Sequence, residues 1–353
     1  MVTEFIERIQ AATAQKKPLC IQGGATKTWY GQEPQGEILS TRTYSGIIDY
    51  DPTELVITAR CGTPLAEIKQ ELAAQHQFLA FEPPSFGIDA TIGGAVATGL
   101  AGPRRAYAGG VRDFVLGAVL LNGSAERLTF GGQVMKNVAG YDVSRMLAGS
   151  MGCLGLLLEL SIKVLPVPHS ECTLRFETTE SDALAKFNQW AGMPLPISAS
   201  SWENGQLTLR LSGSEPATTQ AMQQLGGEQL LAEQAAQHWL ALNEQTASFF
   251  QQQGTLWRLS LPSTSPSLDL GAPQLIEWGG AQRWLHLSNE YNHQQLRQQV
   301  AGLGGHATLF KGGDKNIGVF QALPRPIFSI HQRLKSSFDP AGIFNPGRLY
   351  SEL

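Results

Sequence analysis

The sequence predicts an α+β protein made of two domains and a C-terminal tail. Its 353 residues are about twice the length of an average domain. Strand and helix patterns alternate through the first half, and Pro166-Val167-Pro168 marks a break after which glutamine becomes frequent. Two loosely repeated strand–helix–strand units follow, which favours an antiparallel sheet with helices on one face. We expect domains over residues 1–168 and 169–323, and a tail over 324–353.

The helices of the first half follow from local patterns. Apolar residues at helical spacing from Phe5 onward predict a helix that ends at Lys16-Lys17-Pro18. Thr63 followed by Pro64 is typical of a helix N-terminus, with threonine as the cap and proline in the first turn. The apolar residues of 65–72 then form the buried stripe of that helix.

Strands of the first half are expected where β-branched and apolar residues run together. Asn122-Gly123-Ser124 lies between two such runs and predicts a β-hairpin. The expected strands cover 19–21, 55–59, 115–121, 127–130 and 154–165.

The second half is read in the same way. Asn204-Gly205 between apolar runs predicts another hairpin. The tail shows a helix through Ile330, Leu334 and Phe338, followed by Asp339-Pro340. The other expected elements are strands over 173–177, 256–261, 275–278, 283–287 and 306–310, and helices over 181–191, 216–225, 228–250 and 290–300.

Composition and charge exclude several classes of protein. The net charge is -4 and the pI about 6.0, so no strong field attracts nucleic acid or anionic lipid. The longest apolar run, 154–165, is shorter than a membrane span and is interrupted by polar residues. The N-terminus shows no secretory signal, and no basic amphipathic helix marks a membrane surface. The four cysteines are widely spaced without a Cys-x-x-Cys pair, which disfavours zinc and iron–sulfur ligation.

A glycine-rich turn, Gly23-Gly24-Ala25-Thr26, directly follows the strand at 19–21. Such a turn directs several backbone N–H groups into one concavity, which suits a phosphate group. It matches neither a Walker loop nor the Gly-x-Gly-x-x-Gly pattern. Taken alone, the pattern is a weak signal and favours an ordinary glycine turn.

Four further segments stand out. Glu82-Pro83-Pro84 precedes the small residues of 91–99, which allow either close approach to a flat ligand or close helix packing. Residues 136–142 read Lys-Asn-Val-Ala-Gly-Tyr-Asp, and 149–155 carry three glycines at three-residue spacing. Residues 344–348 read Phe-Asn-Pro-Gly-Arg.

In this order and spacing, the segments resemble the vanillyl-alcohol oxidase/p-cresol methylhydroxylase (PCMH) family of flavoproteins. The resemblance is dense over 18–168 and returns over 324–350. Within this family, the chain is similar to the branch that holds D-2-hydroxyacid dehydrogenases and the flavin subunits of bacterial glycolate oxidases. The resemblance is greatest to the smaller FAD-binding subunits. It implies a PCMH-type FAD-binding domain of two subdomains and an antiparallel-sheet α+β cap domain.

The resemblance also implies residues that contact non-covalent FAD. They comprise a pyrophosphate turn, a second wall, a stretch beside the adenosine and ribityl groups, and one residue near the isoalloxazine ring. The pyrophosphate turn comprises Gln22, Gly23, Gly24, Ala25, Thr26 and Lys27, and the second wall comprises Pro84, Thr91, Gly93, Gly94, Thr98 and Gly99. The stretch beside the adenosine and ribityl groups comprises Gly149, Ser150, Gly152, Leu154 and Gly155, and the residue near the isoalloxazine ring is Asn345.

Departures from the family pattern shape the functional hypothesis. Relatives with covalent flavin carry a histidine in the first glycine turn, where this chain has Ala25 and Lys27. Catalytic members carry a histidine-rich cap segment, but here only His306 remains, and a lone histidine is a poor metal site. We therefore assign no metal and no catalytic residue. Arg104-Arg105, with Arg112 nearby, could hold a substrate carboxylate or a partner, or lie in a solvated loop.

The resemblance implies an FAD-binding subunit of a glycolate oxidase complex that converts glycolate to glyoxylate. A base would remove the hydroxyl proton while a hydride passes to the flavin. A larger catalytic flavin subunit and an iron–sulfur subunit are the expected partners, and a small 2-hydroxyacid the substrate. The alternatives are an autonomous FAD-dependent D-2-hydroxyacid dehydrogenase and a non-catalytic scaffold subunit. We expect a cytoplasmic protein, with any membrane attachment made through partner subunits.

Overall fold

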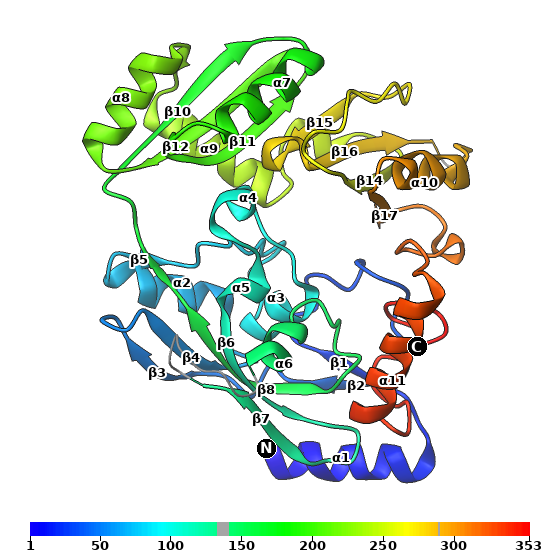
Figure 1. The fold of residues 1–353 in the computed structure, drawn as a ribbon. Helices are drawn as coiled ribbons and strands as arrows, with labels where there is room; N and C mark the ends of the chain where they lie inside the picture. The colour runs from blue at the N-terminus through cyan, green and yellow to red at the C-terminus, as the bar shows by residue number, and fades with distance from the viewer. Residues whose placement is uncertain (133–140, 289) are drawn as a thin grey trace. The chain divides into compact units, whose positions relative to one another are not determined.

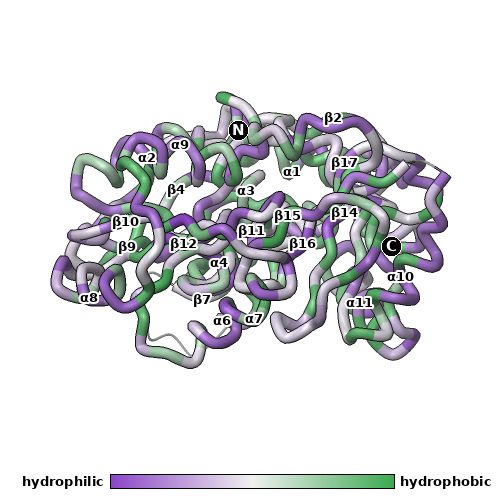
Figure 2. The backbone as a smooth tube through the Cα atoms, turned by 90° about the horizontal axis from the view of Figure 1, so that it is seen from above, coloured by the Kyte–Doolittle hydropathy of each residue, from purple (hydrophilic) through white to green (hydrophobic). Residues whose placement is uncertain are grey.

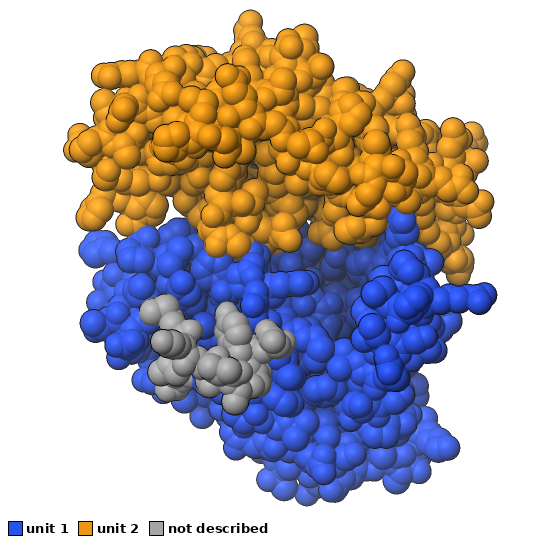
Figure 3. Space-filling model, viewed as in Figure 1, with its two compact units in different colours: residues 1–100, 110–166, 318–353 blue, residues 101–109, 167–317 orange. Residues whose placement is uncertain are grey.

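The computed structural model describes residues 1–132, 141–288 and 290–353, without the side chains of Tyr141 and Asp142. The chain divides into two compact units (Figure 3). The first unit comprises residues 1–100, 110–166 and 318–353, and the second comprises 101–109 and 167–317. Both units combine helices with mainly antiparallel sheets, so the predicted α+β class is confirmed.

The first unit contains a five-stranded antiparallel sheet in the order β3-β4-β8-β6-β7, a parallel pair β1-β2 and a short antiparallel pair β5-β9 (Figure 1). Its strands are β1 (Leu19–Gln22), β2 (Glu37–Ser40), β3 (Ile47–Asp51), β4 (Val56–Arg60), β5 (Gln77–Phe78), β6 (Val115–Leu121), β7 (Arg127–Gly131), β8 (Leu156–Lys163) and β9 (Leu165–Pro166). Its helices are α1 (Val2–Gln15), α2 (Leu65–Ala74), α3 (Ile92–Thr98), α5 (Val111–Phe114), α6 (Tyr141–Met146) and α11 (Arg325–Phe338).

Local sequence explains most of these elements. Helix α1 buries Phe5, Ile9 and Ala12 and ends where Lys16 adopts a left-handed conformation. The predicted hairpin is present as β6 and β7. The predicted helix cap at Thr63 is wrong, because its hydroxyl is bonded to Gly46 and to the carbonyl of Arg60, 2.7 Å away. Pro64 takes the cap position of α2 instead.

The second unit contains one eight-stranded antiparallel sheet in the order β13-β10-β12-β11-β15-β16-β14-β17. Its strands are β10 (Ser170–Glu177), β11 (Ile197–Glu203), β12 (Gln206–Gly213), β13 (Glu228–Gln229), β14 (Thr255–Ser260), β15 (Gln274–Glu277), β16 (Gln282–Leu287) and β17 (His306–Lys311). Its helices are α4 (Arg105–Ala108), α7 (Glu180–Ala191), α8 (Glu215–Leu225), α9 (Ala232–Asn243) and α10 (His293–Gly302), with 3-10 turns at Ser248–Gln251, Trp278–Gly280 and Lys315–Ile317.

The long helix predicted over 228–250 is wrong at both ends. Its first residues form β13, which pairs with β10, and the N–H of Leu230 donates to Thr173 O at 3.0 Å. Helix α9 stops at Asn243, and Gln245 then turns left-handed. Pairing with the sheet edge outweighs the local helix preference at the start of this segment.

The predicted domain ranges 1–168, 169–323 and 324–353 differ from the compact units chiefly at residues 101–109. This segment leaves the end of α3 and belongs to the second unit. There Trp278 Nε1 donates to Gly102 O at 3.1 Å, and Tyr107 Oη lies 3.3 Å from Ser200 Oγ. The local sequence pattern does not indicate that residues 101–109 belong to the second unit, because their contacts are with residues about 100 or more positions away. The domain ranges themselves stay a prediction.

Candidate functional site

Two glycines of the turn that follows β1 lie where no side chain fits. A Cβ atom at Gly24 would collide with the carbonyl oxygen of Asp89, and one at Gly23 would collide with Thr91 Oγ1. Neither glycine has a positive φ, so the need for glycine is steric. Ala25 has a φ of 61°, which turns the chain within the loop.

The backbone donors of this turn are available to a ligand. Within the described ranges, the N–H groups of Gly23, Gly24, Ala25 and Thr26 donate to no other residue. The Thr26 hydroxyl donates to the carbonyl of Ser85 at 2.8 Å, which holds the loop in place. Successive N–H groups around a left-handed residue form a concavity for an anion.

The second wall is the short helix α3 and the residues that begin it. Thr91 Oγ1 accepts a hydrogen bond from the N–H of Gly94 at 3.2 Å and so caps the helix. Gly93 lies against Cys61, whose Cβ and carbonyl oxygen would be 2.7 Å from an added Cβ. Close packing, one of the two interpretations that the sequence left open, therefore accounts for the glycine at position 93.

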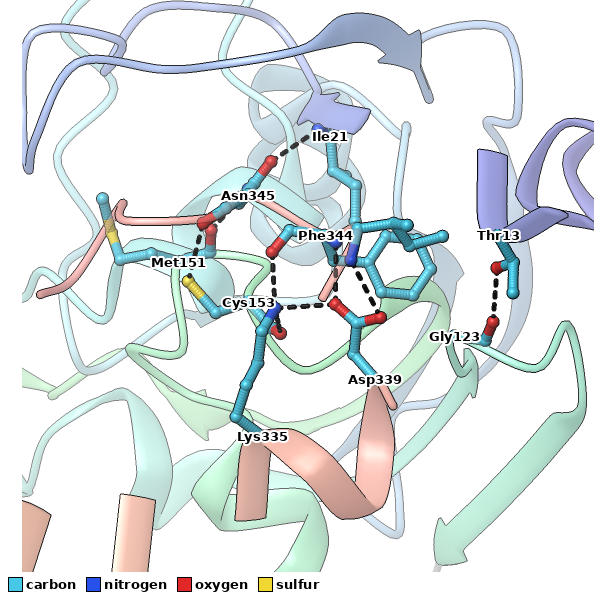
Figure 4. Close-up of polar contacts among 10 residues, drawn as sticks. Thr13, Ile21, Gly123, Met151, Cys153, Lys335, Asp339, Phe344 and Asn345 are labelled. Atoms are coloured by element: carbon cyan, nitrogen blue, oxygen red, sulfur yellow. Dashed lines mark hydrogen bonds and ion pairs between the residues drawn. The ribbon is translucent and has the colours of Figure 1, made fainter. Parts of the chain in front are cut away.

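Asn345 joins three distant parts of the first unit (Figure 4). Its Oδ1 accepts from the N–H of Ile21 at 2.8 Å, and its Nδ2 donates to the carbonyl of Met151 at 2.6 Å. The buried amide thus connects β1 to the loop before β8. Its predicted place beside the isoalloxazine ring stays a prediction, but its positioning contacts are in the structure.

A buried ion pair anchors the tail that carries Asn345 (Figure 4). Lys335 Nζ lies 2.7 Å from Asp339 Oδ2 and also donates to the carbonyls of Cys153 and Phe344, at 2.8 and 2.7 Å. The Asp339 carboxylate accepts from the N–H groups of Ile343 and Phe344. All three ammonium protons have acceptors, so this buried pair is fully hydrogen-bonded.

Arg348 places a buried cation at the glycine turn. Its side chain is 7% exposed, and Nη2 donates to the carbonyl of Thr28 at 2.7 Å. Nη1 is buried and has no partner in the described structure. Burial lowers the pKa of this guanidinium, yet a guanidinium stays charged in proteins. The charge of Glu33 acts on this guanidinium, but the buried Nη1 still lacks an acceptor, which an oxygen of an anionic ligand would supply. The sequence pattern marks the segment 344–348 but indicates no role for Arg348.

These groups surround one pocket, which we call the glycine pocket. The predicted residues Gln22, Gly23, Gly24, Ala25, Thr26, Lys27, Thr91, Gly94, Thr98 and Asn345 line it, together with Ile21, Thr28, Ala97, Met151 and Arg348. An adjoining pocket shares part of this lining and adds the predicted Gly93, Gly152 and Gly155, together with Thr41, Cys61 and Leu157.

Other predicted site residues lie elsewhere. Gly149, Ser150 and Leu154 line a separate pocket beside α11. The loop before β8 therefore contributes to two sites, because its residues Gly152 and Gly155 line the adjoining pocket instead. Pro84 and Gly99 line none of these three pockets. Residues 136–140 and the side chains of Tyr141 and Asp142 lie outside the described part of the chain.

Arg104 and His306, which the sequence suggested for substrate or metal binding, do not line the glycine pocket. Arg104 Nη2 lies 2.7 Å from Glu171 Oε2, so the charge considered for a substrate carboxylate already has a counter-ion. His306 begins β17 opposite Ser260. Among the described residues, no group of three histidine, cysteine or acidic side chains could hold a metal ion. Within the same ranges, every helix is too short or too polar to cross a bilayer.

Comparison with known proteins identifies an FAD-binding domain in the first unit and relatives among glycolate oxidase subunits. The family model "FAD binding domain" matches residues 2–131, which include the glycine turn and α3. The glycolate oxidase subunit GlcE of Escherichia coli K12 is 49% identical over 99% of this chain and 97% of its own length. The glycolate oxidase subunit GlcD of Bacillus subtilis 168 is 29% identical over 52% of this chain and 40% of its own.

A solved structure of alkyldihydroxyacetonephosphate synthase shares the fold, with a TM-score of 0.63 at 14% identity over 97% of this chain and 73% of that one. The family predicted from the motifs is confirmed. The chain therefore belongs to the family of the glycolate oxidase subunit GlcE, within the flavoproteins that carry this FAD-binding domain.

Proposed function

We propose that the glycine pocket holds the pyrophosphate of FAD. The observation that carries this proposal is the buried Arg348 guanidinium with its unsatisfied Nη1, facing a turn of N–H groups that have no acceptor. Two phosphates provide the charge and the oxygen atoms that these donors need. The adjoining pocket adds the small residues Gly93, Gly152 and Gly155, which would let other parts of the cofactor approach the backbone closely.

The flavin is bound without a covalent link. Among the described residues, no histidine lines the glycine pocket or the adjoining pocket. Cys61 lines the adjoining pocket, but burial raises the pKa of its thiol to about 12. A protonated thiol is a poor nucleophile, so this cysteine does not provide an attachment point.

The protein acts as an FAD-binding subunit of a cytoplasmic glycolate oxidase complex. Oxidation of glycolate to glyoxylate releases two electrons and two protons, and a bound flavin can accept both electrons together as a hydride. The likeness to GlcE over the whole chain supports the subunit role. The counter-ion on Arg104 and the lack of a metal-ligating group beside His306 among the described residues support placing the oxidation itself in a larger flavin subunit. An iron–sulfur subunit completes the proposed complex as the electron acceptor.

The visible absorption spectrum of the purified chain tests the proposal, before and after anaerobic glycolate. Flavin bands that persist with glycolate, and bleach only when the partner subunits are present, are the expected result. Bleaching of the isolated chain would make it an autonomous dehydrogenase. Absence of flavin bands after incubation with FAD would remove the cofactor and leave a scaffold subunit.

A further inference from the structure

Residues 101–109, which we call the crossing segment, leave the first unit and return to it. Leu100 before the segment and Val111 just after it are both buried and belong to the first unit. Along the chain the hydropathy falls from the apolar residues of α3 to the arginines at the start of α4, as the colours of Figure 2 show. The crossing segment is therefore anchored to the first unit at both ends.

Side chains of the second unit hold the middle of the crossing segment. Trp278 Nε1 donates to Gly102 O at 3.1 Å, and the guanidinium carbon of Arg105 lies 4.5 Å from the centre of the Trp278 ring. Tyr107 Oη lies 3.3 Å from Ser200 Oγ. Two hydrogen bonds and a cation–π contact thus act on one short helix and the residues before it.

A buried ion pair adds to these attachments. Arg104 is 8% exposed, and its Nη2 lies 2.7 Å from Glu171 Oε2. Glu171 also accepts from Ser212 Oγ at 2.6 Å, and Arg210 Nε lies 3.9 Å away. Burial by itself raises the pKa of Glu171, but Arg210, Ser212 and Arg104 together hold it below its usual range. Breaking a buried pair leaves an uncompensated charge, so the crossing segment is costly to detach.

The crossing segment begins beside a wall of the glycine pocket. Helix α3 ends at Gly99, which is left-handed, and only Leu100 separates Gly99 from the crossing segment. Ala97 and Thr98, in the last turn of α3, line the glycine pocket. A shift of the crossing segment therefore acts first on residues that line the ligand site.

The end of α3 also supports the opposite wall of the pocket. The carbonyls of Val96 and Ala97 accept from the N–H groups of Gly149 and Met151, at 3.0 and 2.8 Å. Met151 lines the glycine pocket, and its own carbonyl accepts from Asn345 Nδ2 at 2.6 Å. Hydrogen bonds thus connect the end of α3 with the loop before β8 and with the C-terminal tail.

We infer that the second unit positions the end of α3 through the crossing segment, so that Trp278 and Glu171 are positioning residues for the glycine pocket. This inference rests on the proposed function, because the position of α3 sets the affinity for FAD. If α3 takes several positions, only a fraction of the molecules can bind, and the apparent affinity falls by that fraction. By reciprocity, a ligand in the glycine pocket stabilises the attachment of the crossing segment to the second unit.

Affinities of the flavin-free chain for FAD and for ADP test the inference. ADP carries the pyrophosphate but no flavin, so it reports on the glycine pocket alone. Trp278→Phe keeps a ring for Arg105 but loses the hydrogen bond to Gly102, and should weaken binding of both ligands by about 2- to 10-fold. Glu171→Gln leaves the Arg104 charge buried without its counter-ion and should weaken binding at least as much.

Trp202→Phe is the matched control for Trp278→Phe. The indole N–H of Trp202 donates to Thr178 O at 2.9 Å, within the second unit but outside the crossing segment. This control should lose a similar amount of stability in thermal melting and keep its affinity for ADP. Tyr107→Phe, a milder variant that removes one hydroxyl group, should weaken ADP binding by about two- to threefold without a risk to folding.

Hydrogen exchange gives a reciprocal readout that a merely structural role would not move. In wild type, ADP should slow exchange in peptides that cover 278–281, where the N–H of Gly279 donates to Ser200 Oγ at 2.9 Å. Trp278→Phe should lose this protection at saturating ADP, and Trp202→Phe should keep it.

The outcomes separate this inference from the proposed function. Equal affinity for ADP in Trp278→Phe and wild type would overturn the inference and leave the proposed function intact. An equal loss of affinity in Trp202→Phe would do the same, as would wild-type peptides over 278–281 that ADP does not protect. A wild-type chain that binds neither FAD nor ADP would overturn both.

Discussion

The side-chain oxygen of Asn345 accepts a 2.8 Å hydrogen bond from the backbone N–H of Ile21, although 324 residues separate the two. The same amide donates to Met151 on the opposite wall of the glycine pocket. The C-terminal tail thus completes a pocket that the N-terminal strand begins. Binding of FAD should depend on the tail as much as on the glycine turn.

Asn345→Asp should weaken the site more than its similar size suggests. A carboxylate can still accept from Ile21 but cannot donate to Met151 O, which would face a charged oxygen. The free energy of unfolding should fall by about 1–3 kcal/mol, the cost of an unpaired buried polar group. Urea unfolding and FAD titration measure the two effects. An unchanged FAD affinity in Asn345→Asp would contradict the positioning role.

Arg348→Met should weaken FAD binding by about 10- to 100-fold, the worth of one charge-assisted hydrogen bond. Arg348→Lys should recover part of the lost FAD affinity, because lysine restores the positive charge but not the planar guanidinium group. Flavin fluorescence titration measures affinity, and ADP competition locates the loss at the pyrophosphate. Arg127→Met, which removes a surface pair with Glu159, is the control. Equal affinity for ADP in Arg348→Met and wild type would contradict the assignment.

Gly24→Ala should destabilise the chain and abolish FAD uptake, because the added methyl group would meet the carbonyl of Asp89. Overpacking of this kind costs about 1–3 kcal/mol. Gly302→Ala is the matched control, since a Cβ there meets nothing within 4 Å. Thermal melting with and without FAD gives both readouts. A normal flavin content in Gly24→Ala would show that the turn does not approach the ligand.

Lys335→Met should lower the free energy of unfolding by about 3–5 kcal/mol, because it leaves the Asp339 charge buried without a cation. Three acceptors lose their donor, on Cys153, Asp339 and Phe344. The tail that carries Arg348 then loosens, so FAD affinity should fall as well. Lys17→Met, at an exposed position just after α1, serves as the control in urea unfolding. A change below about 1 kcal/mol would mean that the pair adds little.

The stability of the second unit should fall as the pH drops from about 6.5 to 4. Burial, followed by the charges of Arg175 and Arg210, lowers the pKa of His238 to about 4. The unfolded chain, with a histidine pKa near 6.5, then binds a proton that the folded state does not. Melting temperatures between pH 7.5 and 4.5 should decline less steeply in His238→Gln than in wild type. His293→Gln is the comparison, and equal slopes in all three proteins would refute the assignment.

Elements with a strong local signal were predicted closely. The stripe of α1 and the two hairpin turns depend on side chains and backbone geometry within a few residues. The helix predicted over 228–250 failed because its start is taken by pairing with β10, a contact more than 50 residues away in sequence. Likewise, the cap at Thr63 failed because Gly46 and Arg60 occupy its hydroxyl.

By itself, the sequence determined the fold class, the FAD-binding family and the glycine-rich segments, because each depends on local patterns and motifs of neighbouring residues. The tertiary structure decided which of those segments share a pocket. It grouped Gly23, Thr91 and Asn345 while turning Ser150 and Leu154 toward α11. It alone revealed Arg348 as a buried cation of the glycine pocket, since burial and an unsatisfied donor arise only when distant segments pack together.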